Sequence, residues 1–171
     1  MHILGAILGG GQSIRFGSDK AQALYQGRAL IDHALEALRP HASALIVVGR
    51  DWQGVTRVDD LPAPGLGPLG GLLGALVYAG THGFDAVLSC GCDTLGLTAD
   101  HIAALTPAPA VLDALPIIGL WPVSAHAHLA DWLAGGNSRS VYAFADHLGA
   151  RRIVVETPPA NINRPDDLSA L

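Results

Sequence analysis

The stretch "GAILGGGQSIRFGSDKA", residues 5–21, joins an apolar run to three consecutive glycines and then to two basic residues, Arg15 and Lys20. Glycines have no Cβ atom, so their backbone N–H groups can approach an anion closely. The planar fork of Arg15 and the mobile charge of Lys20 both suit phosphate oxygens, and Ser13 could add a hydroxyl donor. The stretch therefore predicts either a phosphate-binding loop after a first strand or a glycine-rich turn with surface cations.

Neither of two familiar phosphate-binding motifs accounts for this loop. It lacks the G-x-x-x-x-G-K-[ST] spacing of a P-loop and the spacing of a dinucleotide fingerprint. A literal G-x-G-x-x-G occurs later, at Gly65, Gly67 and Gly70, but "LPAP" precedes it where the fingerprint needs a strand. Pro68 would also remove an N–H donor. We interpret 61–71 as a rigid Pro/Gly loop that leads into a helix and forms one wall of a pocket.

Outward from the opening stretch, apolar runs alternate with helical patterns. The expected strands cover 2–8, 44–49, 55–60 and 84–91, two short strands within 110–123, and 151–156. The expected helices cover 28–38, 72–79, 99–105 with Thr98 as the cap, 125–134, 138–148 and 164–171. This alternation predicts an α/β fold of three layers, with a doubly wound, mostly parallel sheet. We expect residues 1–171 to form a single domain.

Three of the connecting loops follow expected strands and should meet at one edge of the sheet, where such folds bind ligands. These loops are 9–20, 60–71 and 91–98. Asp93 follows a buried strand, where it could hold a nucleotide-bound Mg²⁺ or simply cap a turn. Asp60, beside a second aspartate, could bind a ribose or a metal, or belong to a solvated turn.

The segment "NINRPDDL" (161–168) places two asparagines before the last expected helix. Asn161 or Asn163 could orient a phosphate or the edge of a pterin-like ring. Asparagine before a helix is equally typical of a cap.

Composition narrows the class of protein. The formal net charge is −5, which does not favour a broad nucleic-acid surface, so an anionic ligand needs a local cluster of positive groups. The two cysteines, Cys90 and Cys92, are too few for a disulfide framework and fit a reducing, cytoplasmic setting. No stretch has the length of a membrane span, and we expect no signal peptide.

Four segments, in this order, resemble the MobA family of molybdenum cofactor guanylyltransferases. They are "LGGGQSIRFGSDKA" (8–21), "GPLGG" (67–71), "CDT" (92–94) and "INRPDDL" (162–168). The corresponding family forms are L-A-G-G-x-S-x-R-M-G-x-D-K, G-P-L-x-G, C-D-x-P and N-T-P-E-D-L. The resemblance covers nearly the whole chain. It implies a Rossmann-like fold of the nucleotide-diphospho-sugar transferase type, in a single nucleotidyltransferase domain.

The resemblance implies that GMP is transferred from GTP to the terminal phosphate of molybdopterin, with release of pyrophosphate. It implies Mg²⁺ as the cofactor and, as further partners, proteins of molybdenum insertion and molybdoenzyme maturation. The implied site residues are Leu8, Gly9, Gly10, Gly11 and Ser13 for the nucleotide, Arg15 and Lys20 for its phosphates, Asp60 in the nucleotide site, and Asp93 for the metal.

The chain also departs from the family pattern. Phe16 replaces the usual Met, Gly9 the usual Ala, and Leu95 the Pro of C-D-x-P. Arg164 replaces the Thr of N-T-P, and in the alignment Val48 falls near a family Asn that contacts the nucleotide. The stretch 107–117, which the resemblance implies helps to enclose the pterin, is shorter than in the family.

Other functions stay open for this sequence. The alternatives in the same class are a molybdopterin cytidylyltransferase and a transferase that acts on a sugar phosphate. The alternative from another class is a degenerate protein that binds nucleotide or molybdopterin as a carrier or regulator.

Overall fold

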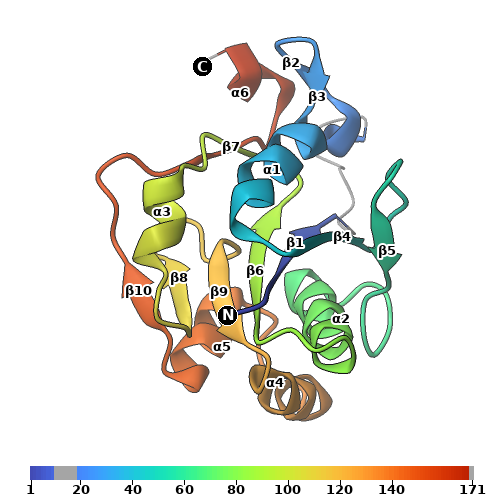
Figure 1. The fold of residues 1–171 in the computed structure, drawn as a ribbon, viewed down its shortest axis with the longest axis vertical. Coiled ribbons are helices and arrows are strands. Elements are labelled where there is room, and N and C mark those ends of the chain that lie inside the picture. The colour runs from blue at the N-terminus through green and yellow to red at the C-terminus, as the bar shows by residue number, and fades with distance from the viewer. Residues whose placement is uncertain (10–18, 170–171) are drawn as a thin grey trace.

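The computed structural model describes residues 1–9 and 19–169, and its centre is a seven-stranded sheet (Figure 1). All of these strands except β9 run in one direction. In sheet order they are β10 (Arg151–Ile153), β8 (Ala110–Leu112), β9 (Gly119–Pro122), β6 (Ala86–Gly91), β1 (Ile3–Leu8), β4 (Ala44–Val48) and β5 (Thr56–Val58). The mostly parallel sheet expected from the sequence is confirmed.

Helices cover both faces of the sheet and complete the three layers. One face packs against α1 (Leu30–Leu38) and α3 (Ala99–Ala104). The other packs against α2 (Pro68–Thr81), α4 (Ala125–Ala134) and α5 (Val141–Leu148). The doubly wound arrangement follows from strands that are apolar on both faces, since each face needs a helical layer to exclude water.

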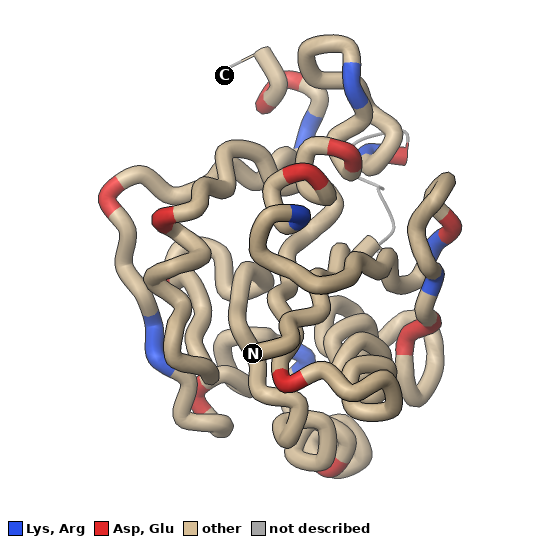
Figure 2. Tube along the Cα trace, in the orientation of Figure 1, with Lys and Arg blue, Asp and Glu red and all other residues tan. Residues whose placement is uncertain are grey.

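Strand β1 shows how the core is divided. Leu4 and Ala6 point into the cluster that contains α2, whereas Ile7 points into the cluster that contains α1. All three are fully buried because β1 lies in the interior of the sheet. Positions with acidic and basic residues are scattered along the trace and do not gather by sign in one region (Figure 2). Within residues 1–9 and 19–169, no helix combines the length and the apolarity that crossing a bilayer requires.

Helix α2 begins earlier than the sequence predicted. We expected a loop up to residue 71, but the helix starts at Pro68, with Gly67 at the N-cap and a φ of 68°. Proline suits the first turn of a helix because its missing N–H has no intrahelical partner there. Gly74 lets α2 lie close to the preceding loop, since a Cβ at this position would collide with the carbonyl oxygen of Asp59.

Several short elements were not predicted. They are the hairpin of β2 (Leu24–Tyr25) and β3 (Arg28–Ala29), the pair of β7 (Thr94–Leu95) and β11 (Ala160–Asn161), and the 3-10 helices η1 (Lys20–Gln22) and η2 (Arg39–His41). The last predicted helix is present as α6 (Pro165–Ser169). The antiparallel β7–β11 pair matters most because it brings residues near the C-terminus next to the segment that follows β6.

Candidate active site

A cavity of about 400 Å³ lies where β1, β4 and β6 reach their carboxyl ends. Its lining residues from these ends are Leu8, Gly9, Val48, Gly91, Cys92 and Asp93, with Asp60 beyond β5. Lys20, Gly65, Gly67, Pro68, Gly71, Leu115, Pro116, Ile117, Val141 and Asn161 complete the lining. The expectation that the three strand-end loops meet at one edge is therefore confirmed for their described residues. So is the expectation that the Pro/Gly loop forms one pocket wall.

Lys20 and Asp93 form an ion pair in this cavity. The Lys20 Nζ donates to Asp93 Oδ2 at 2.7 Å, and only 22% and 9% of the two side chains are exposed. Lys20 is the first residue of η1, and Asp93 follows β6 closely. A Cβ at Gly91 would lie 2.6 Å from Asp93 Oδ1, so the glycine leaves the space that this carboxylate occupies.

Asn161 approaches the same carboxylate from β11. With its amide nitrogen turned toward Asp93, it donates to Oδ1 at 3.0 Å and to Oδ2 at 2.9 Å. The backbone N–H of Ile162 also donates to the Asp93 carbonyl oxygen at 3.1 Å. The sequence left open whether Asn161 is a site residue or a helix cap, and the structure places it in the site.

Asp60 lies on another side of the cavity with an unused acceptor. Its Oδ1 is buried, and no hydrogen-bond partner for it occurs among the described residues. Burial raises the pKa of Asp60 above its usual range, and the nearby charge of Asp59 adds to the effect. A half-buried carboxylate that faces a cavity without a donor is suited to accept hydrogen bonds from a ligand.

Both cysteines lie beside the site but are unsuited to chemistry there. Burial raises the pKa of the Cys92 thiol to about 11, and the Asp93 charge contributes. Burial raises the pKa of Cys90 still further. Because the thiolate is the reactive form, both side chains act as small apolar groups at neutral pH. This agrees with the interpretation of them as buried residues at a strand end.

Part of the predicted site lies outside the described residues, namely Gly10, Gly11, Ser13 and Arg15. The structure brings together the remaining candidates: Leu8, Gly9, Lys20, Asp60 and Asp93. The segment Leu115–Ile117 also lines the cavity, and it belongs to the stretch 107–117 that the family resemblance associates with enclosing the pterin. The start of α5 at Val141 was not predicted to contribute to the cavity. The apolar side chain of Val141 resembles that of a core residue in the sequence, so no local signal distinguishes it.

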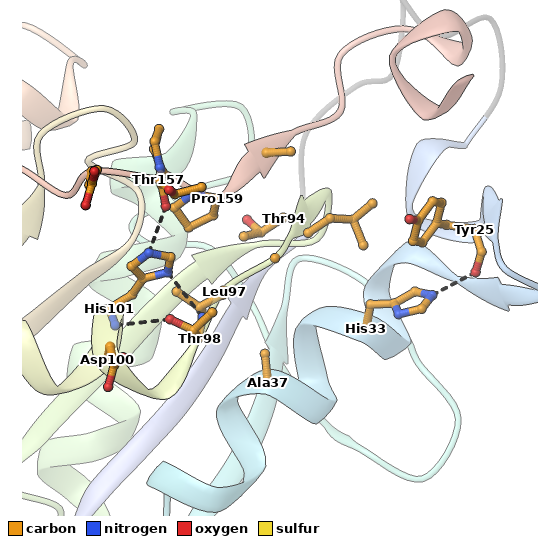
Figure 3. Close-up of a pocket in the computed structure, with 15 residues that line it drawn as sticks. Tyr25, His33, Ala37, Thr94, Leu97, Thr98, Asp100, His101, Thr157 and Pro159 are labelled. Atoms are coloured by element: carbon orange, nitrogen blue, oxygen red, sulfur yellow. Dashed lines mark hydrogen bonds between the residues drawn. The ribbon is translucent and has the colours of Figure 1, made fainter. Parts of the chain in front are cut away.

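A second, larger cavity of about 750 Å³ lies between α1 and α3 (Figure 3). His33 Nε2 donates to the Tyr25 carbonyl oxygen at 2.8 Å, and His33 lies opposite His101, whose Nε2 donates to the Thr157 carbonyl oxygen at 2.9 Å. The lining includes Asp100 and Glu156 but, among the described residues, no lysine or arginine. Its volume exceeds that of the first cavity, but its charge is unsuited to phosphate.

The strand-end cavity, with a lysine and two aspartates, defines an α/β protein of the nucleotide-binding class. The sequence matches the family model of the MobA-like NTP transferase domain over residues 5–155. This chain therefore belongs to the MobA-like NTP transferase family.

Relatives and solved structures agree with this assignment. A molybdenum cofactor guanylyltransferase of Acidiphilium cryptum is 33% identical, with 99% of this chain and 93% of the relative covered. One from Cereibacter sphaeroides is 35% identical, with 99% and 95% covered.

Two crystal structures show the same fold. Molybdopterin-guanine dinucleotide biosynthesis protein A of Archaeoglobus fulgidus superposes with a TM-score of 0.74 at 22% identity, covering 98% of this chain and 95% of that one. The 2-C-methyl-D-erythritol 4-phosphate cytidylyltransferase of Thermus thermophilus has a TM-score of 0.65 at 15% identity, with 99% and 96% covered. The fold is thus that of the nucleotide-diphospho-sugar transferases, as the resemblance implied.

Proposed function

We propose that this chain transfers GMP from GTP to the terminal phosphate of molybdopterin and releases pyrophosphate, in a reaction that depends on Mg²⁺. The observation that carries the proposal is the Lys20–Asp93 pair, which places an ammonium group and a carboxylate 2.7 Å apart in the cavity. Relatives named molybdenum cofactor guanylyltransferase, at 33% and 35% identity, support the choice of substrates.

The chemistry needs positive charge more than it needs a protein nucleophile. Attack of one phosphate on another produces a crowded, highly anionic transition state, which fixed cations and N–H donors stabilise. Lys20 supplies such a cation, and we assign Arg15 to the same task. The acceptor phosphate is itself the nucleophile and is already ionised near neutral pH, so the reaction needs no general base.

Asp93 fits a Mg²⁺ site that the substrate completes. Mg²⁺ is usually bound through one or two carboxylates together with substrate phosphates and water. The described residues contain no cluster of three or more His, Cys, Asp or Glu side chains that could hold a metal by themselves. When bound, Mg²⁺ would polarise the α-phosphate of GTP. Asn161, which donates to both carboxylate oxygens, holds Asp93 in orientation.

Asp60 and the end of β1 are assigned to the nucleotide. Asp60 lines the cavity, and its carboxylate can receive hydrogen bonds from nucleoside donors. Leu8 and Gly9 offer backbone groups at the strand end, and we extend this cradle to Gly10, Gly11 and Ser13. Val48 is fully buried and contributes an apolar surface only, so hydrogen bonds that select the base must come from other groups.

An assay with purified components tests the proposal. The chain is incubated with molybdopterin and Mg²⁺ and with either GTP or CTP, and the dinucleotide product and pyrophosphate are measured. We expect the guanine dinucleotide, loss of turnover on chelation with EDTA, and recovery when Mg²⁺ is added back. A cytosine product, or turnover of a sugar phosphate in place of molybdopterin, would identify one of the related transferases. Nucleotide binding without pyrophosphate release would identify a carrier.

The wider setting is also part of the proposal. We assign the whole reaction to one domain spanning residues 1–171, working in the cytoplasm next to proteins of molybdenum insertion and molybdoenzyme maturation. The cytoplasmic assignment is supported by the cysteine content of the chain, since two cysteines are too few for the disulfide framework of a small secreted domain.

A further inference from the structure

Arg50 extends from the end of β4 to the segment that carries Lys20. Its Nη1 donates to Asp19 Oδ1 at 2.9 Å and its Nη2 donates to Asp19 Oδ2 at 2.7 Å. The side chains are only 21% and 34% exposed. A two-bond contact between guanidinium and carboxylate is stronger and more directional than a single ion pair. Arg50 therefore fixes both the position and the plane of the Asp19 carboxylate.

Gly9 leaves room for Arg50 to lie in this way. The N–H of Gly9 donates to the Val48 carbonyl oxygen at 3.0 Å, which joins the ends of β1 and β4. A Cβ at Gly9 would lie 2.9 Å from Cδ and 3.1 Å from Cγ of Arg50. The aliphatic part of Arg50 thus packs directly over the glycine before its guanidinium reaches Asp19.

Asp19 in turn holds the first turn of η1. Its Oδ1 accepts from the N–H of Ala21 at 3.2 Å, and its Oδ2 accepts from Nε2 of Gln22 at 3.1 Å. The hydrogen bond from Arg50 is the main cause that lowers the pKa of Asp19, so this carboxylate is ionised at neutral pH. Lys20 lies between Asp19 and Ala21, and its backbone is held on both sides.

We propose that Arg50 is a positioning residue that acts through Asp19 and η1 to present the Lys20 ammonium group to Asp93 and to substrate phosphate. Arg50 does not line the cavity, so its proposed role is to position Lys20 and not to bind phosphate directly. The role toward phosphate rests on the proposed function. The effect on Lys20 itself can be measured without any substrate.

The chain contains a single lysine, Lys20, so an amine-acylating reagent reports on one side chain once the N-terminal amine is accounted for by peptide mass spectrometry. The labelling rate of Lys20 is compared in the wild type, Arg50→Ala and Arg152→Ala. Arg152 is a matched control because it also makes a two-bond contact, with Asp146, at 3.0 and 2.7 Å. It lies in β10, away from the lining of the active-site cavity.

We expect the rate to rise roughly tenfold in Arg50→Ala, the scale on which residues of one hydrogen-bond network are coupled, and to stay unchanged in Arg152→Ala. Asp19→Asn should raise it similarly, and Arg50→Lys should give an intermediate rate because a single ammonium group cannot bind both oxygens. If Arg50→Ala does not fold, the labelling rates of Asp19→Asn and Arg50→Lys provide the test. An unchanged labelling rate at Lys20 in folded Arg50 and Asp19 variants would overturn the proposal.

A double-mutant cycle on GTP binding gives the second readout. If Arg50 acts through Lys20, Arg50→Ala combined with Lys20→Ala binds GTP no more weakly than Lys20→Ala alone. Fully additive losses would show that Arg50 contacts phosphate itself and would overturn the positioning role. A wild-type protein that binds no nucleotide would instead contradict the proposed function, and the labelling rates would still decide the role of Arg50.

Discussion

The two cavities of this protein differ in chemistry more than in size. The larger one, between α1 and α3, has a volume of about 750 Å³, and the active-site cavity about 400 Å³. The β7–β11 pair contributes to both, with Leu95 and Ala160 in the larger cavity and Asn161 in the smaller. Only the smaller one has, among its described residues, a lysine paired with an aspartate.

This difference shows that a cavity can bind a polar ligand only if some of its polar groups are not already used in contacts within the protein. In the larger cavity, the ring nitrogens of His101 contact the backbone at Thr98 and Thr157, so they hold protein segments together. In the smaller cavity, Asp60 keeps a buried oxygen that has no partner among the described residues. Volume alone would therefore have selected the cavity that has no lysine–aspartate pair among its described residues.

Of the substitutions that compare the two cavities, Asp93→Asn should have the largest effect on activity. We expect kcat/KM to fall about a thousandfold, as when a group that stabilises transition-state charge is removed, while the circular dichroism spectrum is preserved. Asp100→Asn makes the same change in the larger cavity and should leave the kinetics unchanged. Equal losses in both variants would remove the functional distinction between the cavities.

Lys20→Ala should have the next largest effect. The ammonium group pairs with substrate charge, so we expect the affinity for GTP to fall about tenfold to a hundredfold, the range of a charge-assisted contact. Calorimetric titration with GMP should show a smaller loss, because GMP has fewer phosphates. If GTP and GMP lose affinity equally, Lys20 does not act on the triphosphate.

Asp60→Asn should weaken nucleotide binding several-fold and slightly stabilise the free protein. Burial raises the pKa of Asp60, so ionised Asp60 costs folding free energy above its unfolded pKa of about 3.8. The free energy of unfolding of the variant should be slightly higher than that of the wild type at neutral pH, and this gain should vanish well below pH 3.8, where Asp60 is protonated in both states. Urea unfolding at pH 7 and at about pH 2 measures this. A gain that persists in acid would contradict the assigned cause.

His101→Ala should have the smallest effect on catalysis. The His101 side chain completes a capping box at the start of α3 with Thr98 and also contacts Thr157. We expect a loss of stability of about 1 kcal/mol, seen as a melting temperature lower by about 2–4 °C, with kcat unchanged. A large fall in kcat would show that the larger cavity contributes to the reaction.

Most of the fold could be predicted because periodicity is a local property of the chain. The strands β1, β4 and β6 appear in the sequence as continuous apolar runs, and their burial on both faces explains why. The start of α2 was missed because proline and glycine in "GPLGG" have the composition of a loop, although proline is favoured in the first turn of a helix. The two-residue strands have no period that a sequence could reveal.

The candidate site could be predicted in part. Lys20, Asp60 and Asp93 all follow apolar strands or belong to the glycine loop, and these loops meet because parallel strands end at one edge. Arg50 also follows a strand and could have been found by the same rule. The sequence could not decide whether Asn161 is a site residue or a helix cap. Its position depends on the β7–β11 pair, which no local sequence pattern predicts.

The sequence by itself determined the order of the longer strands and helices along the chain, the fold class and the family. Apolar periodicity and motif spacing depend only on neighbouring residues, so they can be recognised without a fold. The tertiary structure decided which side chains face one another: Asn161 with Asp93, and Arg50 with Asp19. These contacts join residues far apart in the chain, and only the packing of loops at the sheet edge sets their distances.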